Sequence, residues 1–493
     1  MKPASTKARG ARQTGGVTAV SGGLLLAVVA LCSCAAVGPK YVKPKVSVPD
    51  AWTRATTSGS PATQDHSEDL SHWWRQLGDP VLSSLIERSL AASPDMRSAR
   101  AKLREARARR RLAGAEHFPT VTGSTSISLS KTGNIATSDL YSAGFDASWE
   151  PDVFGATRRG VEAAQADLEA TGASLHDTQV SLAAEVAVNY VELRAYQVRL
   201  KIAKENLASQ TETLELTSWR AQAGLTSSLD VEQARANREQ THAQIPSLET
   251  GLAEAEHRLA VLLGLTPAGL HNELATEAPI PSVPQQVAVG IPADTLRQRP
   301  DVRAAERNLA AETARLGKAM AARYPSFSLS GSLGLSASAL SLGALASSDA
   351  VSRSLLTTLT APIFDRGRIR QQIEIQDAVQ EQALVSYETV VLTALKDVED
   401  ALVSLANSRL RQEALTQAVE AARNAALLAR QRYTVGITDF QTVLDTERTV
   451  LTVEDSLVST EADGTTALVQ LYKALGGGWS PDVASAPQKG HSK

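Results

Sequence analysis

Two cysteines carry the clearest chemical signature in this sequence, because they follow an apolar leader. Basic residues open the chain, and the apolar run at residues 17–31 is too short to span a bilayer and is typical of a secretory signal. The run ends in Leu31-Cys32-Ser33-Cys34, which resembles a bacterial lipobox. We expect cleavage before Cys34 and acylation of its thiol, which leaves one cysteine and no internal disulfide. An ordinary signal peptide with an incidental thiol is the alternative.

The motifs of common enzymes are missing from the sequence. The eight histidines contain no HExxH or paired metal spacing, and there is neither a GxxxxGK(S/T) phosphate loop nor a serine in a nucleophile elbow. The net charge of −3 does not favour a nucleic-acid partner, and the basic run at 107–111 is more simply a solvated helix face than a binding patch. We therefore expect no enzyme activity, no metal and no cofactor beyond the covalent lipid.

Four segments of about ten residues alternate polar and apolar side chains, at about 118–130, 140–150, 325–336 and 351–361. Alternation with period two predicts β-strands with two different faces, and strands of this length suit a tilted crossing of a bilayer. The expected hydroxyl face includes Ser124, Ser126, Ser128, Ser328, Ser330 and Ser332. We expect these serines to face the water of a pore and the Phe and Leu side chains to face lipid. A serine-rich linker is the alternative for one segment, but it does not explain four.

The two halves of the chain are related by a tandem duplication. Residues 90–97 match 296–303 at an offset of 206, and residues 220–226 match 432–438 at an offset of 212. Each half predicts a helix, two strands, a long helix, a tight glycine turn and a shorter helix. The long helices are expected at about 160–222 and 369–434, and the short ones at about 94–116, 226–263, 300–322 and 438–475. Two short helices stacked end to end would match one long helix.

The 493 residues allow two or three domains, and the duplication sets the expected boundaries. These are a signal peptide at 1–33, an N-terminal lipoprotein segment at 34–78, a first repeat at 79–265, an equatorial linker at 266–291, a second repeat at 292–478 and a C-terminal tail at 479–493. Four strands cannot close, and an open sheet edge is not tolerated in lipid. The predicted fold class is therefore a mixed α/β membrane protein, a trimeric 12-stranded β-barrel with four strands per chain, continued by a long α-helical barrel.

The residues that follow the leader, CAAVGPKYVKP at 34–44, resemble a known family when they are combined with the duplicated halves and the turn at 432–436. The resemblance is to the outer-membrane channel components of tripartite efflux systems, in the lipoprotein branch of NodT or OprM type, related to TolC. It implies a homotrimer in the bacterial outer membrane, lipid-anchored and extending into the periplasm. It also implies a passive gated duct for drugs, toxic compounds or metal ions, which docks to a periplasmic adaptor and an inner-membrane pump, commonly of the resistance-nodulation-division (RND) class.

The same resemblance points to a gate at the periplasmic tip. Asp445 matches an aspartate that forms a ring at the constriction, where three carboxylates would repel anions and attract cations. Gln441 lies one turn away, where related lipoproteins often carry Leu, and Arg448 is placed to pair with Asp445 on one helical face. Asp230 and Tyr433 match residues that hold the family's tip closed through a hydrogen bond between neighbouring hairpins.

The two glycine turns are expected to be both structural and functional. Glycine permits the positive φ of a helix reversal, and the family's adaptor contact maps onto Gly224, Leu225, Thr226, Gly436, Ile437 and Thr438. For each gate residue the alternative is an exposed polar residue at a helix end, and Asp439 in particular is expected to be a local cap. Two other functions stay open, namely a duct of a type I protein secretion system and a lipid-anchored periplasmic coiled-coil scaffold.

Overall fold

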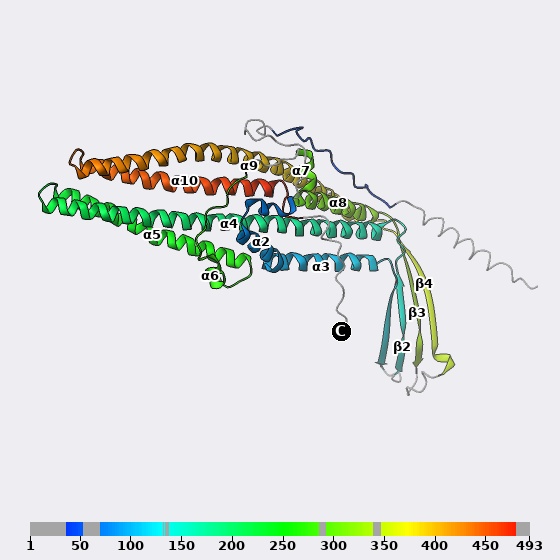
Figure 1. The fold of residues 1–493 in the computed structure, drawn as a ribbon. Helices are drawn as coiled ribbons and strands as arrows, with labels where there is room; N and C mark the ends of the chain where they lie inside the picture. The colour runs from blue at the N-terminus through cyan, green and yellow to red at the C-terminus, as the bar shows by residue number, and fades with distance from the viewer. Residues whose placement is uncertain are drawn as a thin grey trace, which may run out of the picture. The chain divides into compact units, whose positions relative to one another are not determined.

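The computed structural model describes residues 36–52, 70–131, 133, 138–284, 292–338 and 347–479. This part of the chain is mostly helical and contains one four-stranded antiparallel sheet (Figure 1). It divides into two compact units, each described by itself below. The first comprises residues 1–43, 106–168 and 307–384, and the second comprises 44–105, 169–306 and 385–493. Cys34, the expected signal peptide and residues 480–493 lie outside the described residues.

The sheet in the first unit is built from two hairpins of the repeated halves. Strands β1 (Thr120–Ser130) and β2 (Ser138–Trp149) form one hairpin, and β3 (Ser326–Ser338) and β4 (Val351–Thr360) form the other. The strand order is β1-β2-β3-β4, so β1 and β4 are the edges. The hairpins meet at β2 and β3, where a Cβ on Gly144 would lie 2.9 Å from the Cα of Gly334. Only glycine allows this close approach between the two halves.

The residues just after the expected lipid site pack tightly within the first unit. The Val37 amide donates to the Phe154 carbonyl at 3.1 Å. Arg159, only 3% exposed, donates to the carbonyl oxygens of Val37 and Gly38, each at 3.1 Å. A Cβ on Gly38 would lie 2.5 Å from the Cα of Gly317. The buried guanidinium and the glycine contact therefore fix residues 37 and 38, at the start of the expected lipoprotein segment, onto this unit.

The helices repeat in length between the two halves. The long helices α4 (Ala156–Gln222) and α9 (Arg368–Thr434) each contain 67 residues, or about 100 Å at 1.5 Å per residue. The arms that return from them, α5 (Ser228–Leu262) and α10 (Phe440–Ala474), contain 35 residues each. The remaining helices are α2 (Pro80–Ala92), α3 (Pro94–Ala115), α6 (His271–Leu274), α7 (Pro292–Gln298) and α8 (Pro300–Ala321), with 3₁₀ helices at Leu70–Leu77, Pro267–Leu270 and Ser348–Ala350.

Short helices meet end to end in the second unit. Gly264 follows α5, and a Cβ there would lie 3.3 Å from Cδ of Pro94, the first residue of α3. Gly476 follows α10, and a Cβ there would lie 3.2 Å from the Cα of Arg299, just before α8. Both glycines have positive φ, 72° and 79°, as helix C-caps require. The two junctions are repeats of one another, as the sequence predicted.

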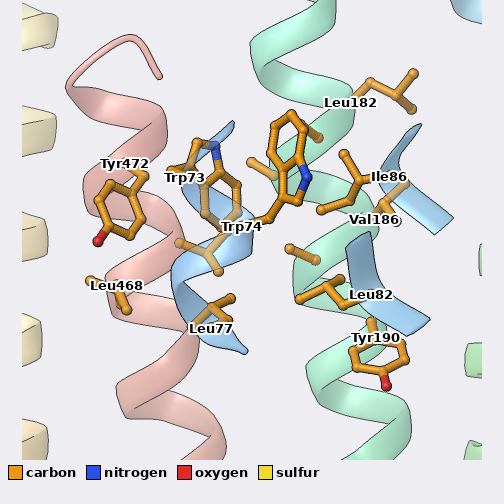
Figure 2. Packing of buried hydrophobic residues seen from close by; sticks show 14 of the residues in the cluster. Trp73, Trp74, Leu77, Leu82, Ile86, Leu182, Val186, Tyr190, Leu468 and Tyr472 are labelled. Atoms are coloured by element: carbon orange, nitrogen blue, oxygen red, sulfur yellow. The ribbon is translucent and has the colours of Figure 1, made fainter. Parts of the chain in front are cut away.

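The main core of the second unit gathers around two tryptophans of the 3₁₀ helix Leu70–Leu77 (Figure 2). The ring of Trp73 stacks on Tyr472 of α10 with centroids 5.2 Å apart, and Trp74 packs edge-on against Trp73. The surrounding apolar side chains come from α2, α4 and α10, among them Leu82, Ile86, Leu182, Val186, Tyr190 and Leu468. This core holds the bases of the two helical hairpins together.

No helix within the described residues combines the length and the apolar character that a membrane-spanning helix requires.

Candidate functional site

Each helical hairpin of the second unit reverses through a glycine turn of the same geometry. Gly224 has φ of 72°, and the Leu225 amide donates to the Arg220 carbonyl at 2.8 Å. Gly436 has φ of 78°, and the Ile437 amide donates to the Arg432 carbonyl at 2.9 Å. Each of these bonds joins an amide to the carbonyl five residues earlier, as in a Schellman helix end. Nothing lies within 4 Å of a Cβ built on either glycine, so the positive φ and not space demands glycine here.

The two returning helices begin with different N-cap side chains, a hydroxyl on α5 and a carboxylate on α10. Ser227 caps α5 and forms a capping box with Asp230, whereas Asp439 caps α10 and accepts from Thr442. The Asp439 carboxylate receives both the amide and the hydroxyl of Thr442, at 3.0 and 2.6 Å. These two hydrogen bonds lower the pKa of Asp439 below its ordinary value. Asp439 is thus the local cap that the sequence predicted.

Asp230 is occupied by its own turn in this structure. Its carboxylate accepts from the Thr226 hydroxyl and, at 3.1 Å, from the Ser227 amide. Partial burial raises the pKa of Asp230, but the hydrogen bonds from Thr226 and Ser227 outweigh burial and hold the pKa below its ordinary value. Within the described chain Asp230 therefore serves the start of α5, and no hydrogen bond joins it to Tyr433.

Tyr433 is instead buried in an aromatic and cationic cage. It is 3% exposed, its ring packs edge-on against Phe440 at 5.7 Å, and the Arg220 guanidinium lies 4.6 Å from the ring centroid. Arg220 also donates to the Thr434 carbonyl at 2.9 Å. The Tyr433 hydroxyl has no hydrogen-bond partner among the described residues. The sequence pattern did not single out Arg220. Its repeat-related position in the second hairpin is Arg432, which is exposed.

Asp445 is exposed on α10, about one helical turn from Gln441 and from Arg448, which are exposed as well. The Gln441 amide donates to the Asp445 carboxylate at 2.9 Å, one helical turn away. The expected pair between Asp445 and Arg448 does not form. Arg448 donates to the Asn237 side chain on α5 at 3.1 Å, because the amide oxygen of Asn237, a residue only 4% exposed, needs a donor.

Two buried glutamates of α10 join the hairpins behind the turns. Glu447 accepts from Thr213 of α4 at 2.8 Å and from Arg430 of α9 at 3.0 Å. One heptad farther along, Glu454 accepts from Asn206 of α4 at 3.1 Å and from Arg423 of α9 at 2.7 Å. The glutamate side chains are only 7% and 8% exposed. Each carboxylate thus bridges the two hairpins from a buried position.

These glutamate bridges were missed from the sequence, although their spacing was visible there. Glu447 and Glu454 are seven residues apart, as are Arg423 and Arg430 on the partner helix. Seven residues are about two helical turns, so one face of each helix carries the pair. A search for opposite charges at matching heptad spacing would have marked these four residues as candidates for ion pairs, but the spacing does not show that the carboxylates are buried between the hairpins.

A small apolar cluster lies between the bridges and the turns. It contains Ala234 of α5 and, from the second hairpin, Ala429, Tyr433, Phe440, Val443 and Leu444. Beyond it the turn residues are exposed, with Leu225 at 67% and Ile437 at 74%, while Thr226 and Thr438 are half-buried. The first turn therefore presents Leu225 to the surroundings, and the second presents both Ile437 and Val435, which is 69% exposed.

The sheet of the first unit has two chemically different faces. Residues directly opposite in a ladder point to the same face, and Ser126 pairs with Ser142, Ser332 with both Asp146 and Ser354. All six predicted serines, Ser124, Ser126, Ser128, Ser328, Ser330 and Ser332, lie on this face. The hydroxyls of Ser126 and Ser142 are 2.8 Å apart, and Ser124 donates to Asp146 at 3.1 Å.

The opposite face of the sheet is apolar. It presents Val121, Ile127, Leu129, Phe145, Leu329, Leu333, Leu355 and Leu359. Arg353 and Asp139 interrupt this face, opposite Leu333 and Leu129, while Leu140 and Leu356 interrupt the hydroxyl face. One face thus suits water and the other suits an apolar medium.

Within the described residues, no His, Cys, Asp and Glu side chains gather into a group that could hold a metal ion.

The chain matches one family model and several curated proteins over most of its length. The family described as "Outer membrane efflux protein" matches residues 85–265 and 291–477. "Nodulation protein T" of Rhizobium leguminosarum bv. trifolii is 32% identical over 469 residues, which cover 92% of this chain and 97% of the relative. "Pyoverdine export outer membrane protein OpmQ" of Pseudomonas putida is 32% identical and covers 89% and 93%. "Toluene efflux pump outer membrane protein TtgI" of Pseudomonas putida is 31% identical and covers 92% and 98%.

Solved structures share the fold. The solved structure described as "Structural insights of the outer-membrane channel OprN" superposes on this chain with a TM-score of 0.83. The two are 38% identical, and the match covers 90% of this chain and 99% of that one. "Crystal Structure of the Open State of the Neisseria gonorrhoeae MtrE Outer Membrane Channel" superposes with a TM-score of 0.80 at 27% identity, covering 90% and 98%. Sequence, repeat structure and fold agree, and the chain belongs to the outer membrane efflux protein family, whose members are transport ducts and not enzymes.

Proposed function

We propose that three copies of this outer-membrane efflux protein assemble into a passive, gated exit duct for small molecules. Their sheets would close into one 12-stranded β-barrel, and their helices would continue it as an α-helical barrel through the periplasm. Such a duct supplies no energy of its own, because the sequence contains no GxxxxGK(S/T) phosphate loop that would bind a nucleotide. The energy for export would come from a partner in the inner membrane.

The two-faced sheet is the observation that carries this proposal. Its hydroxyl face and its apolar face run across all four strands, and β1 and β4 are left as edges. An open edge in lipid leaves backbone groups unpaired at a cost of several kcal/mol each. Pairing β4 of one copy with β1 of the next removes both edges. The serines then face a water-filled interior, and the Leu and Phe side chains face lipid.

The gate would lie at the turns of the helical hairpins. Asp445 is exposed in the single chain and makes no ion pair within the described residues. Threefold symmetry would place three such carboxylates around one axis, where they attract cations and repel anions. Gln441, hydrogen-bonded to Asp445, holds each carboxylate in position. The Glu447 and Glu454 bridges set how far each pair of hairpins can separate.

The proposed anchor and the proposed partner contact lie in different parts of the chain. A lipid on Cys34 would anchor the protein, and Arg159 would hold the segment that follows it. The exposed Leu225 and Ile437 at the turns offer an apolar contact to a periplasmic adaptor. The adaptor would link the duct to an inner-membrane pump, which we assign to the RND class.

The exported compounds are proposed to be small molecules. Relatives are named for pyoverdine export and for toluene efflux. These names favour efflux over protein secretion for this chain. The hydroxyl face is neutral apart from Asp146, so the barrel itself would select weakly by charge.

Single-channel conductance in a planar bilayer tests the proposal. The wild type should show a small, cation-selective conductance, and Asp445→Ala should raise the conductance and reduce the cation selectivity. Glu420→Ala is the matched control, because Glu420 is an exposed carboxylate on the neighbouring helix α9. This variant should behave as wild type. A conductance indifferent to Asp445→Ala would reject the gate and keep the duct. A purified protein that is monomeric and never inserts would reject the duct.

A further inference from the structure

The loop between β4 and α9 presents two large apolar side chains to the surroundings. Ile363 is 97% exposed and Phe364 is 88% exposed. The loop is nevertheless well held, because the Asp365 carboxylate accepts from the amides of Gly367 and Ile369, each at 2.9 Å. Arg366 and Gly367 adopt positive φ, 55° and 85°. A loop fixed in this way presents its apolar residues and does not bury them.

The first half of the chain contains the same loop with its aromatic residue in contact. Val153-Phe154 precedes α4 as Ile363-Phe364 precedes α9. The Phe154 ring stacks on Tyr324, with centroids 4.9 Å apart and planes inclined by 20°. Phe154 follows β2 and Tyr324 precedes β3, and β2 pairs with β3. The stacked rings thus accompany the pairing of two strands from different halves.

The partner of this contact also has a repeat-related copy. His117-Phe118-Pro119 corresponds to Arg323-Tyr324-Pro325 at an offset of 206. Phe118 precedes β1 and is 71% exposed. The chain therefore carries one satisfied aromatic pair at β2 and β3, and one unsatisfied half of the same pair beside each edge strand.

The two unsatisfied halves cannot meet within one chain. Phe364 follows β4 and Phe118 precedes β1, which are opposite edges of the four-stranded sheet. Three strand spacings of about 4.8 Å separate those edges. A head-to-tail contact between copies is the arrangement that joins one edge to the other, and a ring of such contacts can close.

We propose that Phe364 of one copy stacks on Phe118 of the next, and so repeats between copies the contact that Phe154 and Tyr324 make within one. The proposed occupant of the apolar loop is therefore a second copy of this chain. This inference rests on the proposed assembly into a duct, and it adds the side chains that join the copies. Ile363 lies beside Phe364 and extends the same apolar contact.

Cross-linking of paired cysteines tests the contact in the full-length protein in membranes. Phe118→Cys with Phe364→Cys in one chain should give covalent dimers and trimers with a short bis-maleimide reagent. Tyr324→Cys with Phe154→Cys is the matched control, because the same geometry within one chain should give an intrachain product of unchanged mass. Each single variant should give no ladder, which also controls for the native Cys32 and Cys34.

The outcomes separate the contact from the duct. A ladder from the Phe118 and Phe364 pair supports the contact, whether or not the protein conducts. Trimers detected by an amine-reactive cross-linker, with the internal pair reacting and the Phe118 and Phe364 pair silent, would overturn the contact and leave the duct standing. Wild type that stays monomeric would overturn both. A ladder from a trimeric, inserted protein without conductance would support the contact and mean that the gate stays closed without its adaptor.

A second variant checks the contact without cysteines. Phe364→Ser should lower the ratio of trimer to monomer at least about tenfold and leave the helical content of the monomer unchanged. Phe154→Ser should instead lower the yield of folded monomer, because it breaks the pair inside the chain. A trimer ratio that is unaffected by Phe364→Ser would count against the proposal.

Discussion

The two helical hairpins share a backbone and differ in the side chains that it carries. Both long helices have 67 residues, both returning arms have 35, and both reverse at a glycine of positive φ. The returning arms differ in packing. To the small apolar cluster near the turns (the tip cluster), α10 contributes Phe440, Val443 and Leu444, whereas α5 contributes Ala234. Pro246 also interrupts the hydrogen bonds of α5.

The charged bridges show the same asymmetry. Glu447 and Arg430 of the second hairpin correspond to Arg235 and Ser218 of the first at the offset of 212. The first hairpin therefore lacks its own copy of this bridge, and to the two glutamates it supplies the neutral partners Thr213 and Asn206. Duplication kept the backbone because helix reversal restricts it tightly, while the buried side chains diverged. The second hairpin holds the candidate gate, and the first hairpin frames it.

The largest expected effect comes from Tyr433, whose related position in the first hairpin is Ala221. Tyr433→Ala removes a buried ring from the tip cluster and should cost about 3 kcal/mol of local stability. Tyr433→Phe should cost nothing or stabilise the tip, because the hydroxyl is buried without a hydrogen-bond partner. Hydrogen exchange of the α10 amides at Val443 and Leu444 measures both. A loss above about 1 kcal/mol in Tyr433→Phe would mean that the hydroxyl has a partner in the assembled protein.

The second effect tests the bridge that only the second hairpin can make. Arg430→Met leaves the Glu447 carboxylate buried without its cation and should cost about 2 kcal/mol. The value lies below the range for a fully buried pair because the Arg430 side chain is 33% exposed. Proteolysis of the hairpin turns and hydrogen exchange at Thr213 should both accelerate. Arg432→Met, on the exposed side of the same helix, is the control and should change neither.

A smaller effect tests what the two hairpins share. Gly224→Ala and Gly436→Ala should each cost about 1 kcal/mol, because alanine resists the positive φ of both turns. Gly172→Ala, inside α4 with open space around its Cβ, should instead stabilise by roughly 0.5–1 kcal/mol. Thermal unfolding of the three variants compares them directly. Equal responses of Gly172 and the turn glycines would show that φ is not the constraint.

The smallest effect concerns the aspartates that stabilise the N-termini of α5 and α10. The folded pKa of both Asp230 and Asp439 is depressed, so each cap contributes stability that is present above the unfolded pKa of about 3.9 and is lost as the pH falls through the lower folded pKa. The protection of the Thr442 amide against hydrogen exchange, relative to its intrinsic rate at each pH, should therefore fall below about pH 4. Asp439→Asn should remove this pH dependence at Thr442 and leave that at Asp230 intact. Persistent pH dependence at Thr442 in the variant would assign it to another group.

The sequence predicted the local structure of the chain well, for a physical reason. Period-two alternation predicted four strands, and they occur at Thr120–Ser130, Ser138–Trp149, Ser326–Ser338 and Val351–Thr360. Alternation is a property of the strand itself, because successive side chains point to opposite faces. The repeat spacing likewise predicted two equal glycine turns, which depend on neighbouring residues. It also predicted two end-to-end helix junctions, which join distant segments and followed from the matched helix lengths.

The partners of long polar side chains were not predictable in the same way. Sequence spacing favoured Arg448 for Asp445, but Arg448 donates to the buried Asn237 of another helix. The family resemblance points to a bond between Asp230 and Tyr433 of neighbouring hairpins, which stays a prediction. Within the described chain Asp230 accepts from its own turn, and Tyr433 lies under Arg220. A flexible charged side chain reaches several acceptors, and the buried unsatisfied one wins by the largest margin.

The sequence by itself determined the duplication, the two-faced strands and the family, because these depend on residue order and local periodicity. Only the tertiary structure decided which residues bridge the hairpins and which apolar side chains stay exposed. Glu447 and Phe364 illustrate this difference: one is buried between three helices, and the other is presented on a fixed loop. Burial and exposure are properties of packing between distant segments, and no local pattern encodes them.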